Sequence, residues 1–238
     1  MRIRLKLRRG AFFLIAFLFA LVALLPLGLA LRWLQLDERG LAAREAEGSV
    51  WLGGLREARF GDVALGDLSA RLRALPLLVG RARIDLERTG GADGFGGGVT
   101  LSRHGFGVDD VTAGLAIGPL LAPLPVATLD LDDVTAHFAD GQCAGAEGMV
   151  KASLAGEAPG PMLPRSLTGE ARCDGGALLL PLVAPSGMER LDLRLFEDGR
   201  YRIELNVRAA DETMRQRLAA SGFTPAGAGY VLKMEGKF

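Results

Sequence analysis

The chain has 238 residues, 49% of them hydrophobic, and its 28 basic and 28 acidic side chains leave no net charge. Five of the basic residues lie within the first ten positions, so the rest of the chain carries 23 basic residues against 28 acidic ones. This acidic remainder argues against the broad basic surface that nucleic acids require. We therefore expect no nucleic-acid partner.

An uncharged apolar segment begins at Ala11 and ends at Leu31, interrupted only by Pro26 and Gly28. As one helix it would be about 31 Å long, which matches the roughly 30 Å hydrocarbon core of a bilayer. The sequence therefore predicts a single transmembrane helix over residues 11–31. Trp33 follows it directly, at a position typical of the aromatic belt at a membrane surface.

The charges around this segment predict its orientation. Residues 1–10 form a basic head, which belongs on the cytoplasmic side by the positive-inside rule. The rest of the chain would then lie in the periplasm, with the anchor in a bacterial inner membrane. A cleaved signal peptide is the alternative, because Gly28-Leu29-Ala30 resembles a cleavage site. Both interpretations export residues 32–238.

The exported part has the pattern of β-structure. Apolar and polar residues alternate over residues 68–72, 81–88, 188–196 and 201–207, and the chain has 33 glycines. Asp198-Gly199 predicts a hairpin turn, and residues 211–221 predict a short helix capped by Gly222. We expect a curved, mostly antiparallel sheet over residues 48–238, an open half-barrel or jelly-roll-like domain, after a linker at 32–47 with a weak helical turn from Leu41.

Three further features concern a short glycine-flanked segment, a glycine-rich segment and a possible repeat. Residues 48–54 predict a brief strand, with Gly48, Trp51 and Gly53 as a candidate structural motif and Trp51 packed in the core. The glycine-rich residues 89–98 predict a hairpin loop, because no Lys-Ser/Thr follows to bind phosphate. Pro-Leu-Leu occurs at 76–78 and again at 119–121, each time between predicted strands, which suggests a weak internal repeat.

The sequence offers no catalytic or metal-binding pattern. Cys143 and Cys173 predict a disulfide in an oxidising compartment, and with His104 and His137 they do not have the spacing of a zinc site. A Gly-x-Ser-x-Gly nucleophile motif is absent. We expect no enzyme activity, no metal and no cofactor.

The order of these landmarks resembles the protein N family of the type II secretion system, over nearly the whole chain. The residues that carry the resemblance follow one another as Gly48-Ser49-Val50-Trp51-Leu52-Gly53, Leu77-Leu78-Val79-Gly80, Cys143 with Gly148, Leu167-Thr168-Gly169 before Cys173, and Asp198-Gly199-Arg200-Tyr201.

The resemblance implies a single-pass inner-membrane protein with a periplasmic domain that aids protein secretion across the outer membrane. Its partners would be other type II secretion proteins, in the inner-membrane platform and the outer-membrane secretin, met through exposed sheet edges and the membrane helix. The alternative is an AsmA-like lipid-handling protein with an apolar β-groove. A secreted adhesive or structural β-domain is a third hypothesis and requires signal cleavage.

Overall fold

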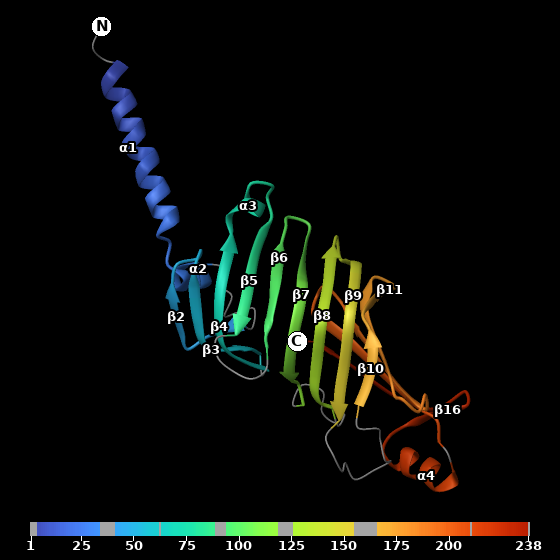
Figure 1. The fold of residues 1–238 in the computed structure, drawn as a ribbon. Coiled ribbons are helices and arrows are strands. Elements are labelled where there is room, and N and C mark those ends of the chain that lie inside the picture. Colours follow the sequence, from blue (N-terminus) through green and yellow to red (C-terminus); the bar gives the residue numbers. More distant parts are fainter. Residues whose placement is uncertain are drawn as a thin grey trace.

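The strands of this chain pair into one long antiparallel sheet, from which the first helix projects at one end (Figure 1). The computed structural model describes residues 4–33, 41–61, 63–88, 94–118, 126–154, 166–209 and 211–237. Within these residues the helices are α1 (Arg4–Ala23), α2 (Leu27–Trp33), α3 (Ala74–Leu77) and α4 (Glu212–Ala220).

The strands vary from two to fourteen residues in length. In chain order they are β1 (Leu41–Ala42), β2 (Glu45–Gly48), β3 (Gly53–Phe60), β4 (Val63–Arg73), β5 (Ala82–Arg88), β6 (Gly96–Leu101), β7 (Gly105–Ala116), β8 (Val126–Ala139), β9 (Gln142–Leu154), β10 (Ser166–Glu170), β11 (Arg172–Asp174), β12 (Ala177–Val183), β13 (Glu189–Leu195), β14 (Arg200–Val207), β15 (Thr224–Ala226) and β16 (Gly229–Lys237).

Strands that are neighbours in the chain are mostly neighbours in the sheet. The order is β1-β3-β4-β5-β6-β7-β8-β9-β10-β12-β13-β14-β16-β15, with β2 paired to β3 and β11 paired to β12. The prediction of a mainly β, antiparallel open sheet with a short C-terminal helix is confirmed. The described strands form one sheet rather than the two sheets of a jelly roll.

Strands such as β4 and β5 turn apolar side chains to one face of the sheet and polar side chains to the other. On β4 and β5, Ala70 pairs with Leu86 on one face, and Arg71 pairs with Asp85 on the opposite face. Because the side-chain period of a strand is two residues, this register keeps the apolar residues together across the sheet. We call the apolar side the inner face and the polar side the outer face.

The inner faces of β8 to β10, β12 to β14 and β16 meet in one hydrophobic core. Leu182 on β12 and Ala152 on β9 have no exposed surface, and Leu218 of α4 packs into the same cluster. In Figure 1 the C-terminal strands, orange to red, pass behind β8 and β9. Burying a leucine side chain contributes roughly 1.5–3 kcal/mol, so this half of the sheet holds most of the hydrophobic stabilisation.

The N-terminal apolar segment is two helices, and the prediction of one continuous helix from Ala11 to Leu31 is wrong. α1 ends at Ala23 and α2 begins at Leu27. Pro26 lies at the break, because proline has no backbone N–H and its ring clashes with the preceding turn. Among the helices of the described residues, none is both long enough and apolar enough to cross a membrane.

The sheet begins earlier than the sequence predicts. The expected linker at 32–47, with a helical turn from Leu41, contains β1 and β2, because Glu45 to Gly48 find hydrogen-bonding partners on β3. The expected strand at 48–54 is a turn between β2 and β3, closed by Ser49 N donating to Leu52 O (3.1 Å).

The glycine-rich segment is partly strand. The expected hairpin loop at 89–98 gives way to β6 at Gly96, since pairing with β5 and β7 on both sides outweighs the poor strand propensity of glycine. Residues 89–93 lie outside the described residues. The second Pro-Leu-Leu segment at 119–121 also lies outside them, so the predicted repeat stays a prediction.

Local signals near the C-terminus are confirmed. β13 and β14 form the predicted hairpin around Asp198-Gly199, where Gly199 has a φ of 80°. α4 lies within the predicted range, and the Asp211 carboxylate caps it by accepting a hydrogen bond from Met214 N (2.7 Å). Gly222 follows the helix with a φ of 85°, a conformation that glycine adopts without strain.

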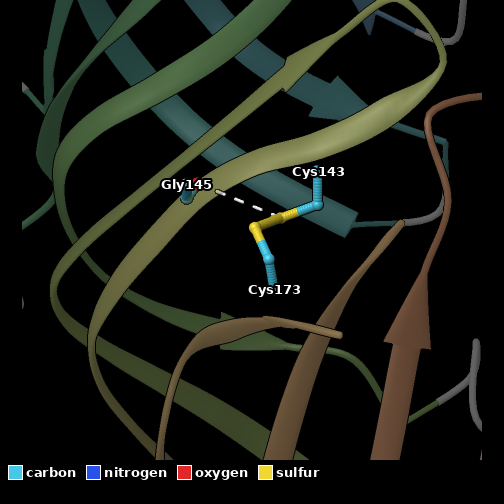
Figure 2. Close-up of a disulfide and its surroundings, with 3 residues drawn as sticks. All are labelled: Cys143, Gly145 and Cys173. Atoms are coloured by element: carbon cyan, nitrogen blue, oxygen red, sulfur yellow. Dashed lines mark hydrogen bonds between the residues drawn. A yellow bond between two sulfur atoms is a disulfide. The ribbon is translucent and has the colours of Figure 1, made fainter. Parts of the chain in front are cut away.

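The predicted disulfide between Cys143 and Cys173 is confirmed (Figure 2). The two Cα atoms are 5.5 Å apart and the residues are separated by 30 positions. Cys143 belongs to β9 and Cys173 to β11, which forms its backbone ladder with β12. The bridge therefore joins two strands that do not share a ladder.

Replacing both cysteines with alanine should lower the free energy of unfolding by about 3–4 kcal/mol, because the unfolded chain regains the freedom of a loop of some thirty residues. Urea denaturation of the full chain in detergent measures this difference. Reductant should destabilise the wild type by a similar amount and leave the double variant unchanged. Equal stability of the two proteins without reductant would contradict the structural role of the bridge.

Candidate functional site

The predicted motif Gly48, Trp51 and Gly53 lies where the N-terminal helices join the sheet. Trp51 Nε1 donates a hydrogen bond to Val22 O (2.9 Å), in the last turn of α1. Val50 N donates to Leu25 O (3.0 Å) in the break between the helices. Trp51 is only half buried, so its predicted role in the core is wrong: its indole holds the end of α1.

The two glycines make this junction sterically feasible. A Cβ atom on Gly53 would lie 2.6 Å from Leu27 Cδ2 and 2.8 Å from Ser49 O. Gly48 has a φ of 79°, and a Cβ there would lie 2.5 Å from Leu52 O. Only glycine fits both positions, and α2 can therefore pack Leu27 against the inner face.

The ends of the predicted membrane anchor lie on different helices. Ala11 is in α1, whereas Leu31 is in α2. Leu31 packs in the cluster that Leu27 of the same helix forms with Leu55 on the inner face of β3. The apolar side chains along α1 are exposed, including those of Phe13 and Phe19. α1 therefore presents apolar surface away from the sheet.

The outer face of β2 to β7, opposite the packed α2, carries a polar hollow of about 660 Å³. Glycines form part of its floor, among them Gly54, Gly96 and Gly98, and leave space that side chains would otherwise fill. Its charged side chains are Glu47, Asp85, Glu87, Asp109 and Asp110 against Arg71, Arg73 and Arg83. We call this site the polar hollow.

Arg83 of β5 lies across the floor of the polar hollow. A Cβ on Gly98 of β6 would lie 3.1 Å from Arg83 Nη2, so the glycine lets the guanidinium pass over β6. It reaches Asp109 Oδ2 at 3.8 Å and Asp110 Oδ2 at 3.4 Å on β7. Asp110 has a φ of 52°, at a bulge that brings both carboxylates within reach of the guanidinium.

The ion pairs continue on both sides of Arg83. Asp85 binds both Arg73 and Arg83, the latter at 3.2 Å. Asp109 accepts a hydrogen bond from Thr100 Oγ1 (2.6 Å) and lies 3.1 Å from His137 Nε2 of β8. The result is one network of charged and polar side chains from β4 to β8.

The ion pairs favour the charged forms of Asp85 and Arg83. Burial would raise the pKa of Asp85, but the hydrogen bonds from Arg73 and Arg83 outweigh it, and the pKa lies below its usual value. Burial would lower the pKa of Arg83, but the Asp85 hydrogen bond and the Asp109 charge outweigh it, and the pKa is raised. The polar hollow therefore offers fixed charges to a polar partner.

The sequence did not identify the polar hollow, because its residues have the pattern of a solvated strand face. The available signal was Gly96-Gly97-Gly98 beside the alternating charges of β5, since consecutive strand glycines leave a depression. Among the residues that the structure describes, no group of three or more His, Cys, Asp or Glu could hold a metal ion.

Gly53→Ala should lower the free energy of unfolding by about 1–3 kcal/mol, because the new methyl group overlaps Leu27 and the Ser49 carbonyl. Gly145→Ala on β9 is the matched control, since a Cβ there meets no atom within 4 Å. Urea denaturation compares the two variants. Equal stability would show that α2 is not packed as described.

Asp85→Asn should cost about 1–2 kcal/mol at pH 7, because it removes a carboxylate held by two guanidinium groups. Since the pKa of Asp85 is lowered by folding, its stabilisation exists above the unfolded value of about 3.9 and disappears as the pH falls through the folded value. The wild type and the variant should therefore converge below about pH 4.

Denaturation curves between neutral and acidic pH test this. Asp130→Asn, at an exposed outer-face position on β8, is the control and should change stability little at any pH. A difference between wild type and Asp85→Asn that grows toward acid would contradict the assignment.

Comparison with known proteins assigns the chain to a family. The sequence model of the type II secretion system protein N family matches residues 39–233, which include every described strand of the sheet except the last part of β16. No curated protein and no solved structure shows a significant match to the chain. The chain belongs to the type II secretion system protein N family.

Proposed function

We propose that this protein is a non-catalytic component of the type II secretion system, held at the inner membrane by α1, with its sheet in the periplasm. The family match over residues 39–233 is the observation that carries the proposal. The sheet would act through contact with other secretion proteins of the inner-membrane platform or the outer-membrane secretin.

Three features of the chain support the location. The side chains of α1 expose a continuous apolar surface, including Phe12, Phe17 and Leu18, which is unfavourable in water and favourable in lipid. The basic residues at the start of the chain favour a cytoplasmic N-terminus. The disulfide supports an oxidising compartment for the sheet, as expected in the periplasm.

The polar hollow is the surface we propose for partner contact. It has five carboxylates against three guanidinium groups, which favours a partner segment that carries Lys or Arg. The sheet edges are the other candidates. One edge consists of the short strands β1 and β2 beside β3, and the other consists of β15, whose Pro225 has no N–H to donate, and the part of β16 beyond Val231.

Lipid handling in the AsmA manner is the competing function. A lipid carrier needs a continuous apolar groove, whereas the inner face of β8 to β16 is filled by its own side chains, such as Leu182 and Leu191. This packing supports the scaffold role. Stoichiometric lipid bound to the purified protein, measured by native mass spectrometry, would instead favour lipid handling.

The proposal predicts a secretion defect in a bacterium that lacks this protein. Wild type should restore release of a type II substrate into the medium. Glu87→Lys reverses an exposed charge lining the polar hollow and should reduce release at least about fivefold, because a positive charge then faces the basic partner segment. Arg71→Glu adds negative charge at the same hollow and should not reduce release. Immunoblots should show unchanged amounts of the variant proteins.

Arg217→Glu on α4 is the matched control, since it reverses an exposed charge outside the polar hollow. Normal secretion without the protein would overturn its role in secretion. Normal secretion with Glu87→Lys, or an equal loss with Glu87→Lys and Arg71→Glu, would overturn the polar hollow as the contact surface for a basic partner segment and leave the role in secretion intact.

A further inference from the structure

We propose that the turn between β4 and β5 inserts into an anionic phospholipid membrane, as a second membrane contact beside α1. The turn, Leu75-Pro76-Leu77-Leu78-Val79, is called the apolar tip below. The inference goes beyond the proposed function and rests on its placement of α1 in a membrane.

The apolar tip exposes an unusual concentration of apolar surface. Leu75 is 80% exposed, Leu78 is 83% exposed and Val79 is 74% exposed. Single exposed apolar residues are common on soluble proteins, but a contiguous cluster marks an interaction site. The neighbouring strand ends extend the cluster, because Leu101 and Phe106 are also exposed.

The backbone of the apolar tip is suited to an apolar medium. Leu78 N, Val79 N and Gly80 N donate to the carbonyls of residues three positions earlier, and Arg81 N donates to Pro76 O at 3.0 Å. Pro76 has no N–H. Peptide groups that enter lipid must be hydrogen-bonded internally, because the hydrocarbon offers no partner. The apolar tip largely meets this requirement.

Cationic side chains flank the apolar tip. Arg71 and Arg73 precede it, and Arg81 and Arg83 follow it. Arg73 and Arg83 belong to the network of the polar hollow. Arg71 and Arg81 have no ion-pair partner among the described residues, and both are exposed. Basic groups around an inserted apolar segment are attracted to anionic head groups, so the tip matches a lipid surface in charge as well as in polarity.

The apolar tip lies at the end of the sheet where α1 joins it. The backbone N–H of Val50 donates a hydrogen bond to Leu25, between α1 and α2. The Val50 carbonyl accepts a hydrogen bond from Leu72 N (3.2 Å), near the end of β4 and just before α3. In Figure 1, α1 and the turn at α3 both rise above the same end of the sheet. A membrane that surrounds α1 is therefore on the side to which the apolar tip points.

Site-directed fluorescence tests this in the full chain. The native cysteines are joined in the disulfide, so Leu78→Cys supplies a single reactive thiol for an environment-sensitive dye. The labelled protein is reconstituted into vesicles of phosphatidylcholine and phosphatidylglycerol, with or without nitroxide-labelled lipid. Phe17→Cys on α1 is the anchoring control, and Ala219→Cys on α4 is the aqueous control.

We expect a blue-shifted emission at position 78 that the nitroxide lipid quenches, as at position 17, and aqueous, unquenched emission at position 219. Quenching at 17 but not at 78 would overturn the membrane contact of the apolar tip and leave the anchoring of α1 standing. Quenching at neither position would overturn the anchoring itself. A blue shift at 78 that nitroxide lipid does not quench would indicate a protein contact and overturn the inference.

The charge contribution has its own test. Arg71→Glu with Arg81→Glu should reduce quenching at position 78 in the mixed vesicles toward the level of position 219, because the head groups then repel the tip. In vesicles of phosphatidylcholine alone, the substitutions should have little effect. Equal loss in both vesicles, or no loss in either, would overturn the attraction to anionic lipid.

Discussion

The two-residue alternation of side chains along paired strands is the constraint on which this structure depends. If one strand slipped by one residue against its neighbour, its apolar side chains would move to the outer face. The bulges of β7 and β8 show how strictly the register is kept. β7 has one extra residue between Val108 and Val111, which pair with Ala136 and Val134 of β8. β8 then has one extra residue between Val134 and Leu131, the partners of Val111 and Ala113, so the pairing returns to its original register. The two bulges compensate, and the inner face stays apolar on both sides of them.

This alternation has different consequences in the two halves of the sheet. In the C-terminal half the inner faces meet, α4 closes one end, and the core excludes water. In the N-terminal half α2 packs on the inner face over a smaller cluster around Leu27, Leu55 and Leu68, and Val63 of β4 reaches the main core. The features that point toward partners or membrane, namely the polar hollow, the apolar tip and the junction with α1, all lie in that half. The C-terminal half of the sheet contains most of the hydrophobic core, and the N-terminal half carries the surfaces proposed to contact partners and membrane.

Much of the architecture could be predicted because its signals are local. The hairpin of β13 and β14 has its turn residues between alternating strands, and α4 has its capping aspartate and its terminal glycine in sequence. The disulfide followed from two cysteines and an exported location. The break at Pro26 was also visible in the sequence, but the apolar composition around it favoured one continuous helix.

The remaining features depend on contacts between distant segments. β2 forms because β3 offers it a partner, and the Gly96 end of β6 is a strand because β5 and β7 enclose it. The polar hollow depends on Arg83 passing over Gly98 to Asp109, which joins three strands. Composition and periodicity carry no information about such a crossing, and the glycines of β6 indicate a depression in the sheet but not the charges that line it.

The central claim is that this two-faced sheet lies outside the cytoplasm, beside the membrane that holds α1. The redox state of Cys143 and Cys173 in living cells tests it most directly. Cells are quenched in acid, and their free thiols are modified with a maleimide reagent large enough to shift the protein on a gel. The account predicts no shift unless the sample is first reduced, and then a shift corresponding to two thiols. Modification of both cysteines without prior reduction would place the sheet in a reducing compartment and contradict the account.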